Sequence, residues 1–263
     1  MSQPFGRVLT AMVTPFTNEG KVNFEAAAEL ARYLLSNGSD GLVVAGTTGE
    51  SPTLSKEEKL ELFKTVKEAV GSDVPVIAGT GSYSTDESIQ LTRLAEKAGA
   101  DGLLVVVPYY NKPTQEGMCR HFEAIAKSTS LPIMLYNIPS RTGKNLEPES
   151  VAKLSKLDNI VAIKESTGDF AQLTELKSKL NNDFLIYSGD DALILPMMAL
   201  GAYGVVSVVS HLVGKEIKEM IEAFVQGDNA KALELHLKLS SLFKTMFITT
   251  NPIPLKAALA LKG

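Results

Sequence analysis

The feature that most constrains the fold is a strict alternation of short β-branched runs with amphipathic segments of helical period. Eight runs are predicted to be buried strands: residues 8–13, 42–45, 76–78, 102–107, 133–136, 160–163, 184–187 and 204–208. Such alternation implies a parallel sheet with right-handed crossovers. Eight units favour a closed (β/α)8 barrel, the TIM barrel, over an open doubly wound sheet. An open sheet would need a nucleotide fingerprint after its first strand, where Thr14-Pro15-Phe16 offers none.

The segments between these runs carry helix signals. Amphipathic patterns predict helices at residues 24–35, 56–69, 86–97 and 116–127. Ser55 with Glu58, and Ser84 with Glu87, have the spacing of a capping box. Two helices end on Gly-Xaa-Asp-Gly, at residues 38–41 and 99–102, which indicates an internally repeated unit.

The domain organisation follows from the same count. Residues 1–226 are predicted to form one barrel catalytic domain, closed by a helix at 212–225. Residues 227–263 are predicted to be a short C-terminal helical extension, with helices at 229–246 and 254–261. A length of 263 residues suits a single barrel, which commonly has about 250.

Composition excludes several classes of function. With 26 basic and 30 acidic residues and no block of like charge, the chain gives no reason to expect nucleic acid or an anionic membrane. The single cysteine, Cys119, excludes an intrachain disulfide and a Cys-based zinc site. His121, His211 and His236 lack metal-ligand spacing, so no metal is expected.

Residues 192–214 carry no formal charge and are long enough to span a bilayer. Pro196, Gly201 and Gly204 interrupt them, so they are predicted to form a short helix at 193–200 followed by a buried strand. The N-terminus lacks the apolar core of a signal peptide. The cytoplasm is therefore the expected location.

Polar residues gather where the predicted strands end, which is where a barrel of this kind carries its chemistry. Lys164 follows the apolar run 160–163, and desolvation there disfavours the charged form of its amine, which favours attack on a carbonyl. Tyr136 ends the preceding strand and can exchange protons in the same mouth. A lysine paired with a carboxylate and a core tyrosine remain the structural alternatives.

Two further groups suit anions. Thr47 and Thr48 lie between glycines, where backbone and hydroxyl groups can donate to a carboxylate, although the motif alone could be merely a tight turn. Arg141 could hold a second carboxylate through two hydrogen bonds, or could be a surface arginine. No dinucleotide loop or P-loop occurs, and Asp190-Asp191 is interpreted as a helix cap.

Taken together, residues 46–51, 136–143 and 162–165 resemble the dihydrodipicolinate synthase family of pyruvate-dependent class I aldolases, in the N-acetylneuraminate lyase superfamily. The resemblance covers essentially the whole chain, as far as Asn251-Pro252-Ile253-Pro254. It implies a (β/α)8 barrel with a C-terminal helical extension. The implied activity is a lyase that condenses pyruvate with L-aspartate 4-semialdehyde to 4-hydroxy-tetrahydrodipicolinate, through a lysine Schiff base, in diaminopimelate and lysine biosynthesis.

The resemblance also implies roles for individual residues. Lys164 would form the Schiff base, and Tyr136 would exchange protons, linked through Thr47 to Tyr110, which reaches the neighbouring subunit's site. Thr48 would bind the carboxylate of pyruvate. The residues implied to complete the substrate pocket are Gly189, the backbone of Val206 and, for the semialdehyde carboxylate, Arg141. No metal or organic cofactor is implied, since the lysine itself is the electron sink.

Assembly and regulation follow from the resemblance as well. It implies at least a dimer, usually within a homotetramer, and a helical extension longer than the one that ends here at Gly263, so the extension is interpreted as truncated. Ser51, Glu87 and Tyr109 match part of a pocket for the end product L-lysine. Sensitive relatives place histidines at the positions of Lys56 and Lys59, so weak feedback is expected.

Two alternatives remain. Another Schiff-base pyruvate aldolase, such as N-acetylneuraminate lyase or a keto-deoxy-sugar acid aldolase, would keep the lysine and the tyrosine. Arg141 and the segment 109–111 favour the synthase. A non-catalytic binding barrel would have no need of Lys164, Tyr136, Thr47 and Tyr110 together.

Overall fold

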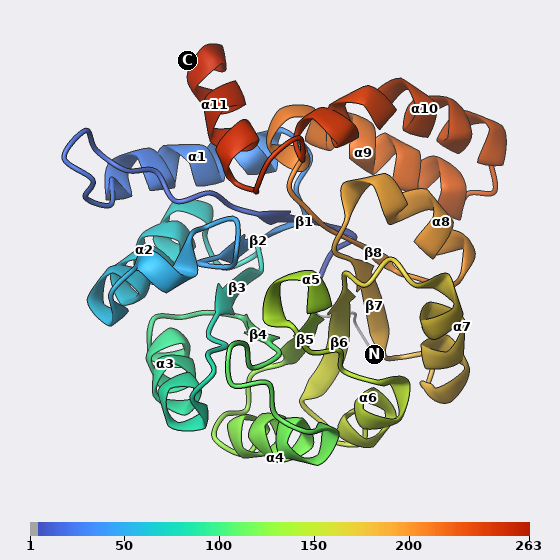
Figure 1. Ribbon diagram of the computed structural model, residues 1–263. Helices are drawn as coiled ribbons and strands as arrows, with labels where there is room; N and C mark the ends of the chain where they lie inside the picture. The colour runs from blue at the N-terminus through green and yellow to red at the C-terminus, as the bar shows by residue number, and fades with distance from the viewer. Residues whose placement is uncertain (1–4) are drawn as a thin grey trace.

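A computed structural model describes residues 5–263 of the chain, and its eight parallel strands close into a barrel in chain order (Figure 1). The strands are β1 (Val8–Ala11), β2 (Gly41–Val44), β3 (Val76–Gly79), β4 (Gly102–Val106), β5 (Ile133–Asn137), β6 (Ile160–Glu165), β7 (Leu185–Ser188) and β8 (Gly204–Ser207). The predicted (β/α)8 fold is confirmed.

Helices surround the barrel (Figure 1). They are α1 (Phe24–Ser36), α2 (Lys56–Val70), α3 (Thr85–Lys97), α4 (Gln115–Ala126), α6 (Pro148–Leu154), α7 (Phe170–Lys179), α8 (Ile194–Ala199) and α9 (Ser210–Val225). Three short helices follow strands: η1 (Ser51–Thr53) after β2, α5 (Pro139–Thr142) after β5 and η2 (Asp191–Leu193) after β7. Beyond the barrel, α10 (Asn229–Thr245) lies beside α9, and α11 (Ile253–Lys262) lies beside α1 (Figure 1).

Several predicted elements differ from the observed ones by one or two residues at an end, and β6 is one of them. This strand continues past Ile163 to Glu165, because Lys164 pairs in register with Tyr136 on one side and Tyr187 on the other. The uncharged stretch 192–214 forms parts of η2 and α9 with α8 and β8 between them. Within residues 5–263, no helix is long and apolar enough to cross a bilayer.

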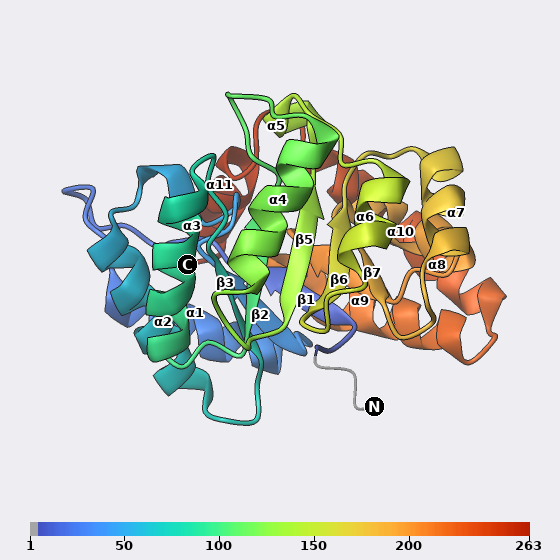
Figure 2. The same ribbon diagram turned by 90° about the horizontal axis from the view of Figure 1, so that it is seen from below.

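Apolar side chains fill the barrel on both sides of its wall. The inner cluster includes Leu9, Ile77, Met134 and Val206, all fully buried. Phe5 closes the end of the barrel at which the strands begin, and a Cβ on Gly102 would lie only 2.6 Å from its ring. Figure 2 shows this N-terminal end on the side opposite α5. The barrel interior is therefore packed, and only its other end is open to chemistry.

The barrel closes between β1 and β8, where Val8 pairs with Val205. A chain of three buried hydroxyls lies beside this seam, and one of its two hydrogen bonds, between Thr10 and Ser210, crosses it. Thr10 Oγ1 lies 2.8 Å from Ser210 Oγ and 2.5 Å from Ser39 Oγ. Both contacts are hydrogen bonds, so these buried hydroxyl groups have hydrogen-bond partners although they are shielded from water.

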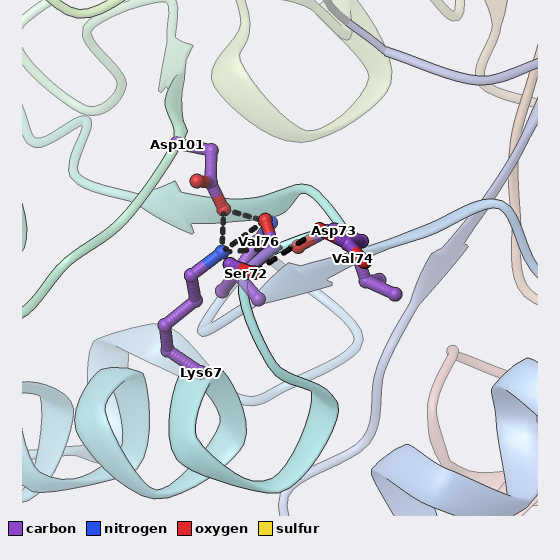
Figure 3. A network of polar contacts seen from close by, with 6 residues as sticks. All are labelled: Lys67, Ser72, Asp73, Val74, Val76 and Asp101. Carbon is purple, nitrogen blue, oxygen red and sulfur yellow. Dashed lines mark hydrogen bonds and ion pairs between the residues drawn. The ribbon is translucent and has the colours of Figure 1, made fainter.

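The repeated Gly-Xaa-Asp-Gly pattern has one structural role at both of its positions. Asp101 accepts hydrogen bonds from Val76 N at 2.8 Å and from Lys67 Nζ at 2.7 Å. Figure 3 shows Lys67 of α2 also donating to the carbonyls of Ser72 and Val74. The carboxylate therefore joins the start of β3, the end of α2 and the start of β4.

Asp40 makes the equivalent contacts one repeat earlier. Its carboxylate accepts from Val8 N at 2.9 Å and from Lys218 Nζ of α9 at 2.7 Å. The hydrogen bond from Lys218 to Asp40 raises the pKa of that lysine. In both repeats an aspartate fixes the start of the preceding strand to a helix, which confirms the predicted repeated unit.

One of the two predicted capping boxes is complete. At α2, Ser55 Oγ accepts from Glu58 N, and Glu58 accepts from Ser55 N. At α3, Ser84 Oγ accepts from Glu87 N, but the Glu87 carboxylate accepts from Ser82 Oγ at 2.7 Å. The predicted helix start at Ser84 is therefore confirmed, but only half of its box forms, because Ser82 Oγ donates to the glutamate instead.

The cap predicted for Asp190-Asp191 is half right. Asp190 caps η2 by accepting from Ala192 N at 2.9 Å. Asp191 is fully buried and accepts from Ser207 Oγ, Val208 N and Val209 N, which fixes the turn from β8 to α9. The three hydrogen bonds lower the pKa of Asp191, but burial has the larger effect and raises it to about 6.

We predict that Asp101→Asn destabilises the barrel while leaving the chemistry of its open end intact. The isosteric amide loses the charge-assisted bond to Lys67, so the free energy of unfolding should fall by about 1–3 kcal/mol. Chemical denaturation measures this loss. Asp73→Asn, an exposed change in the adjoining loop, is the matched control. Equal losses in the two variants would contradict the assigned role of Asp101.

Candidate active site

A cavity of about 210 Å³ opens among the carboxyl ends of β2 to β5. Its lining includes side chains of five residues that were predicted to be functional: Thr47, Ser51, Tyr109, Tyr136 and Arg141. Tyr136 belongs to β5, the other four come from the segments after β2, β4 and β5, and α5 lies at this rim (Figure 2). The parallel barrel therefore brings residues that are far apart in the sequence to one mouth.

Tyr136 and Lys164 are direct neighbours at this end of the barrel. They lie opposite each other in the register of β5 and β6, and both are buried. Lys164 Nζ lies 4.3 Å from the centre of the Tyr136 ring. An ammonium at this distance is attracted by the ring face, so the contact orients the lysine side chain toward the tyrosine.

A glycine makes room for the lysine. A Cβ placed on Gly189 would lie 2.9 Å from Lys164 Cε and 1.8 Å from Ser166 Oγ. Any larger residue would therefore displace one of these two side chains. Val206, the other pocket residue predicted from the resemblance, is fully buried in the inner cluster that also contains Tyr136.

A buried polar network holds β5 and β6 in place beside this pair. Asn137 Nδ2 donates to the Glu165 carboxylate at 3.1 Å, and Thr167 N donates to it at 2.7 Å. Burial raises the pKa of Glu165, while these hydrogen bonds lower it. The residues next to Tyr136 and Lys164 in the chain therefore bond to one another, which fixes the relative position of the two strands.

The loop after β2 has a strained path that a glycine on β3 permits. Ala45 and Glu50 have φ angles of 53° and 56°, in the left-handed region. A Cβ on Gly79 would lie 2.2 Å from the carbonyl oxygen of Ala45. The close approach of β3 to this loop therefore requires glycine, and it sets the place of the two threonines that follow.

The two threonines lie in different surroundings. Thr47 lines the cavity, whereas Thr48 is buried, and its Oγ1 accepts a hydrogen bond from Asn251 Nδ2 at 2.9 Å. The backbone carbonyl of the same asparagine accepts from Arg141 Nη2 at 3.1 Å. Asn251 was missed as a site residue. The sequence feature that could have pointed to it is the segment Asn251-Pro252-Ile253-Pro254, which contributed to the family resemblance.

Tyr110 is not part of the cavity formed by its own chain. Its side chain is 91% exposed, and its backbone has a φ of 67°. The adjacent Tyr109 does line the cavity and packs edge-on against Tyr83, with 5.4 Å between ring centres. The Tyr109-Tyr110 pair therefore presents one ring inward and one to the surface.

The three residues matched to a lysine pocket lie close to one another. Ser51 and Tyr109 line the cavity, and Glu87 accepts a hydrogen bond from Ser82, which also interacts with Tyr109. Burial raises the pKa of Tyr109. Burial lowers the pKa of Lys59, while Glu87 raises it and Lys56 lowers it, so both of these charged residues lie close to Lys59.

His211 has a structural role in the segment around Val13 and Val208. His211 Nε2 accepts from Val13 N at 3.2 Å, and its Nδ1 lies 2.7 Å from the carbonyl oxygen of Val208. Burial lowers its pKa to about 4. In the described part of the chain, no three or more His, Cys, Asp or Glu side chains are grouped to hold a metal ion.

Comparison with known proteins identifies the family. The model of the dihydrodipicolinate synthetase family matches residues 4–263. The chain belongs to this family. A 4-hydroxy-tetrahydrodipicolinate synthase of Desulforamulus reducens is 60% identical over 260 residues, which cover 98% of the chain and 88% of that protein.

Solved structures agree with this assignment. A family member from Cyanidioschyzon merolae, described with lysine bound, has a TM-score of 0.97 and 51% identity, over 99% of the chain and 89% of that protein. A monomeric synthase variant has a TM-score of 0.96 and 44% identity, over 99% and 88%. The family, fold, lyase class and activity predicted from the sequence are confirmed by these relatives.

Proposed function

We propose that this chain condenses pyruvate with L-aspartate 4-semialdehyde through an imine on Lys164. The observation that carries this proposal is the buried contact between Lys164 Nζ and the Tyr136 ring, at 4.3 Å. An amine beside a phenol at the mouth of a barrel has both a nucleophile and a proton carrier within reach. We further propose that the reaction takes place in the cytoplasm.

The chemical steps use these two side chains. The Lys164 amine adds to the ketone carbon of pyruvate, water leaves, and an imine forms. Loss of a proton from the methyl carbon gives an enamine, which attacks the aldehyde carbon. The amine of the second substrate then displaces Lys164, and the ring closes to 4-hydroxy-tetrahydrodipicolinate. Tyr136 carries protons in these steps, and its neighbour in the cavity, Thr47, relays them.

The two carboxylates have separate binding groups in this proposal. Thr48 binds the carboxylate of pyruvate, and Gly189 and the Val206 backbone shape the pocket around it. Arg141, at the rim of the cavity, binds the carboxylate of the semialdehyde. A cation at the rim suits an anionic aldehyde, which favours the synthase over an aldolase for uncharged sugar chains.

Assembly completes the site in this proposal. Tyr110 extends from its own chain with 91% of its side chain exposed, which suits a residue that enters the site of a neighbouring subunit. We propose that the active unit is at least a dimer, within a homotetramer, and that Tyr110 joins the proton relay through Thr47. Size-exclusion chromatography with light scattering tests this assembly, and a monomer in solution, as described for one synthase variant, would contradict it.

We predict that pyruvate and borohydride attach a stable adduct to Lys164. Lys164→Arg should lose the adduct and almost all activity, because a guanidinium stays protonated and cannot form the imine. Peptide mass spectrometry locates the added mass. Lys156→Arg, an exposed change on the loop that leads into the same strand, is the control and should behave like the wild type. An adduct on a lysine other than Lys164 would refute the assignment.

Arg141→Ala should raise the KM for the semialdehyde while leaving trapping of pyruvate intact. A charge-assisted bidentate contact contributes roughly 1.5–3 kcal/mol, so kcat/KM for the semialdehyde should fall at least about tenfold. Steady-state kinetics with each substrate varied in turn distinguishes the two effects. Arg120→Ala, on the exposed face of α4, controls for loss of a positive charge. Unchanged kinetics would place the carboxylate elsewhere.

L-Lysine should inhibit this enzyme weakly. Lys59 lies close to both Glu87 and Lys56, so a dibasic ligand bound at Glu87 would meet added positive charge. At an effective dielectric of about 20, like charges about 6 Å apart repel by roughly 2–3 kcal/mol before salt screening. Replacing both by histidine should strengthen inhibition severalfold, because histidine is mostly neutral at pH 7. Inhibition curves at saturating pyruvate test this. Sub-millimolar inhibition of the wild type would show the expectation to be wrong.

A further inference from the structure

We propose that Asn251, in the C-terminal extension, is a positioning residue for the reaction, which fixes the proton of Thr48 for the carboxylate of pyruvate. This inference rests on the proposed function, which places that carboxylate at Thr48. Asn251 lies in the connection between α10 and α11 and is only 8% exposed. Its side chain and its backbone contact two different carboxylate-binding groups, Thr48 and Arg141.

The side chain determines which way the Thr48 hydroxyl donates. A hydroxyl has one proton and two lone pairs, whereas the amide NH₂ can only donate. Because Asn251 Nδ2 donates to Thr48 Oγ1 at 2.9 Å, Thr48 is the acceptor in this bond. Its single proton is then free for a second acceptor, and an incoming carboxylate supplies one.

The two ends of the Asn251 amide have different surroundings. Within residues 5–263, Asn251 Oδ1 has no hydrogen-bond partner. Turning the amide around would place Oδ1 against Thr48, use the Thr48 proton and leave Nδ2 as the unpaired atom. Only the orientation with Nδ2 facing Thr48 leaves that proton for the carboxylate of the substrate.

The backbone of Asn251 has a separate role. Its carbonyl oxygen accepts from Arg141 Nη2 at 3.1 Å, which holds the guanidinium near the rim of the cavity. A second tie fixes the same segment, because Lys256 of α11 forms an ion pair with Glu50, two residues after Thr48. The extension is thus connected to the loop that carries the threonines at two points.

The side chain of Asn251 contacts Thr48 and its backbone contacts Arg141, so a substitution can remove the first contact and keep the second. Asn251→Ala removes the donor to Thr48 but keeps the carbonyl that holds Arg141. The KM for pyruvate should rise about tenfold, the effect of one hydrogen bond of about 1.4 kcal/mol, and the KM for the semialdehyde should stay within about twofold of the wild type. Equal increases in both KM values would overturn the proposal.

Asn251→Asp is the sharper variant because it keeps the shape of the side chain. A carboxylate can only accept, so it takes the Thr48 proton and adds a negative charge beside the anion site. The KM for pyruvate should rise further than in Asn251→Ala. Asn181→Asp, an exposed change, controls for the added charge and should leave both KM values unchanged. A smaller effect of Asn251→Asp than of Asn251→Ala would contradict the proposal.

A double-mutant cycle tests whether Asn251 acts through Thr48. In a Thr48→Val background, Asn251→Ala should change the KM for pyruvate by less than about twofold, because the hydroxyl that it orients is absent. A loss as large as in the wild-type background would overturn the proposal. If the wild type itself formed no borohydride-trapped adduct with pyruvate, the proposed function would fail. A trapped wild type with an unchanged Asn251→Asp would refute this inference alone.

Discussion

The register between β5 and β6 is the constraint on which the rest of the site depends. It places Tyr136 opposite Lys164, and burial of both side chains leaves the amine next to the ring rather than in water. The hydrogen bond from Asn137 to Glu165, one residue along each strand, holds the same register. A shift of one residue would turn the lysine to the other face of the wall, among the helices.

The fold could be predicted from the sequence because a barrel repeats one simple pattern. Eight apolar runs, separated by amphipathic helices, leave few alternatives, and the capping box at Ser55 marked its helix start correctly. The end of β6 could not be predicted. The apolar run stops at Ile163, and only pairing with β5 and β7 carries the strand on through Lys164.

Tertiary contacts also explain what was missed in the site. Asn251 is 203 residues from Thr48 in the sequence, and no local pattern connects them. Glu87 has the spacing of a capping box, yet a hydroxyl from the preceding loop binds its carboxylate. Lys164, Tyr136 and Thr47 could be predicted as candidates because the ends of parallel strands meet at one end of the barrel. The position of the C-terminal extension, which carries Asn251, cannot be predicted from such a rule.

The seam between β1 and β8 has a consequence for the lifetime of the folded chain. Seven strand pairs join sequence neighbours, whereas Val8 and Val205 are 197 residues apart (205 minus 8). Contacts between distant residues carry the largest loop-closure entropy, so we expect this pair to form last. Interactions made after the folding transition state slow unfolding with little effect on folding. We therefore expect the hydrogen bond between Thr10 of β1 and Ser210, just after β8, to slow the opening of the barrel.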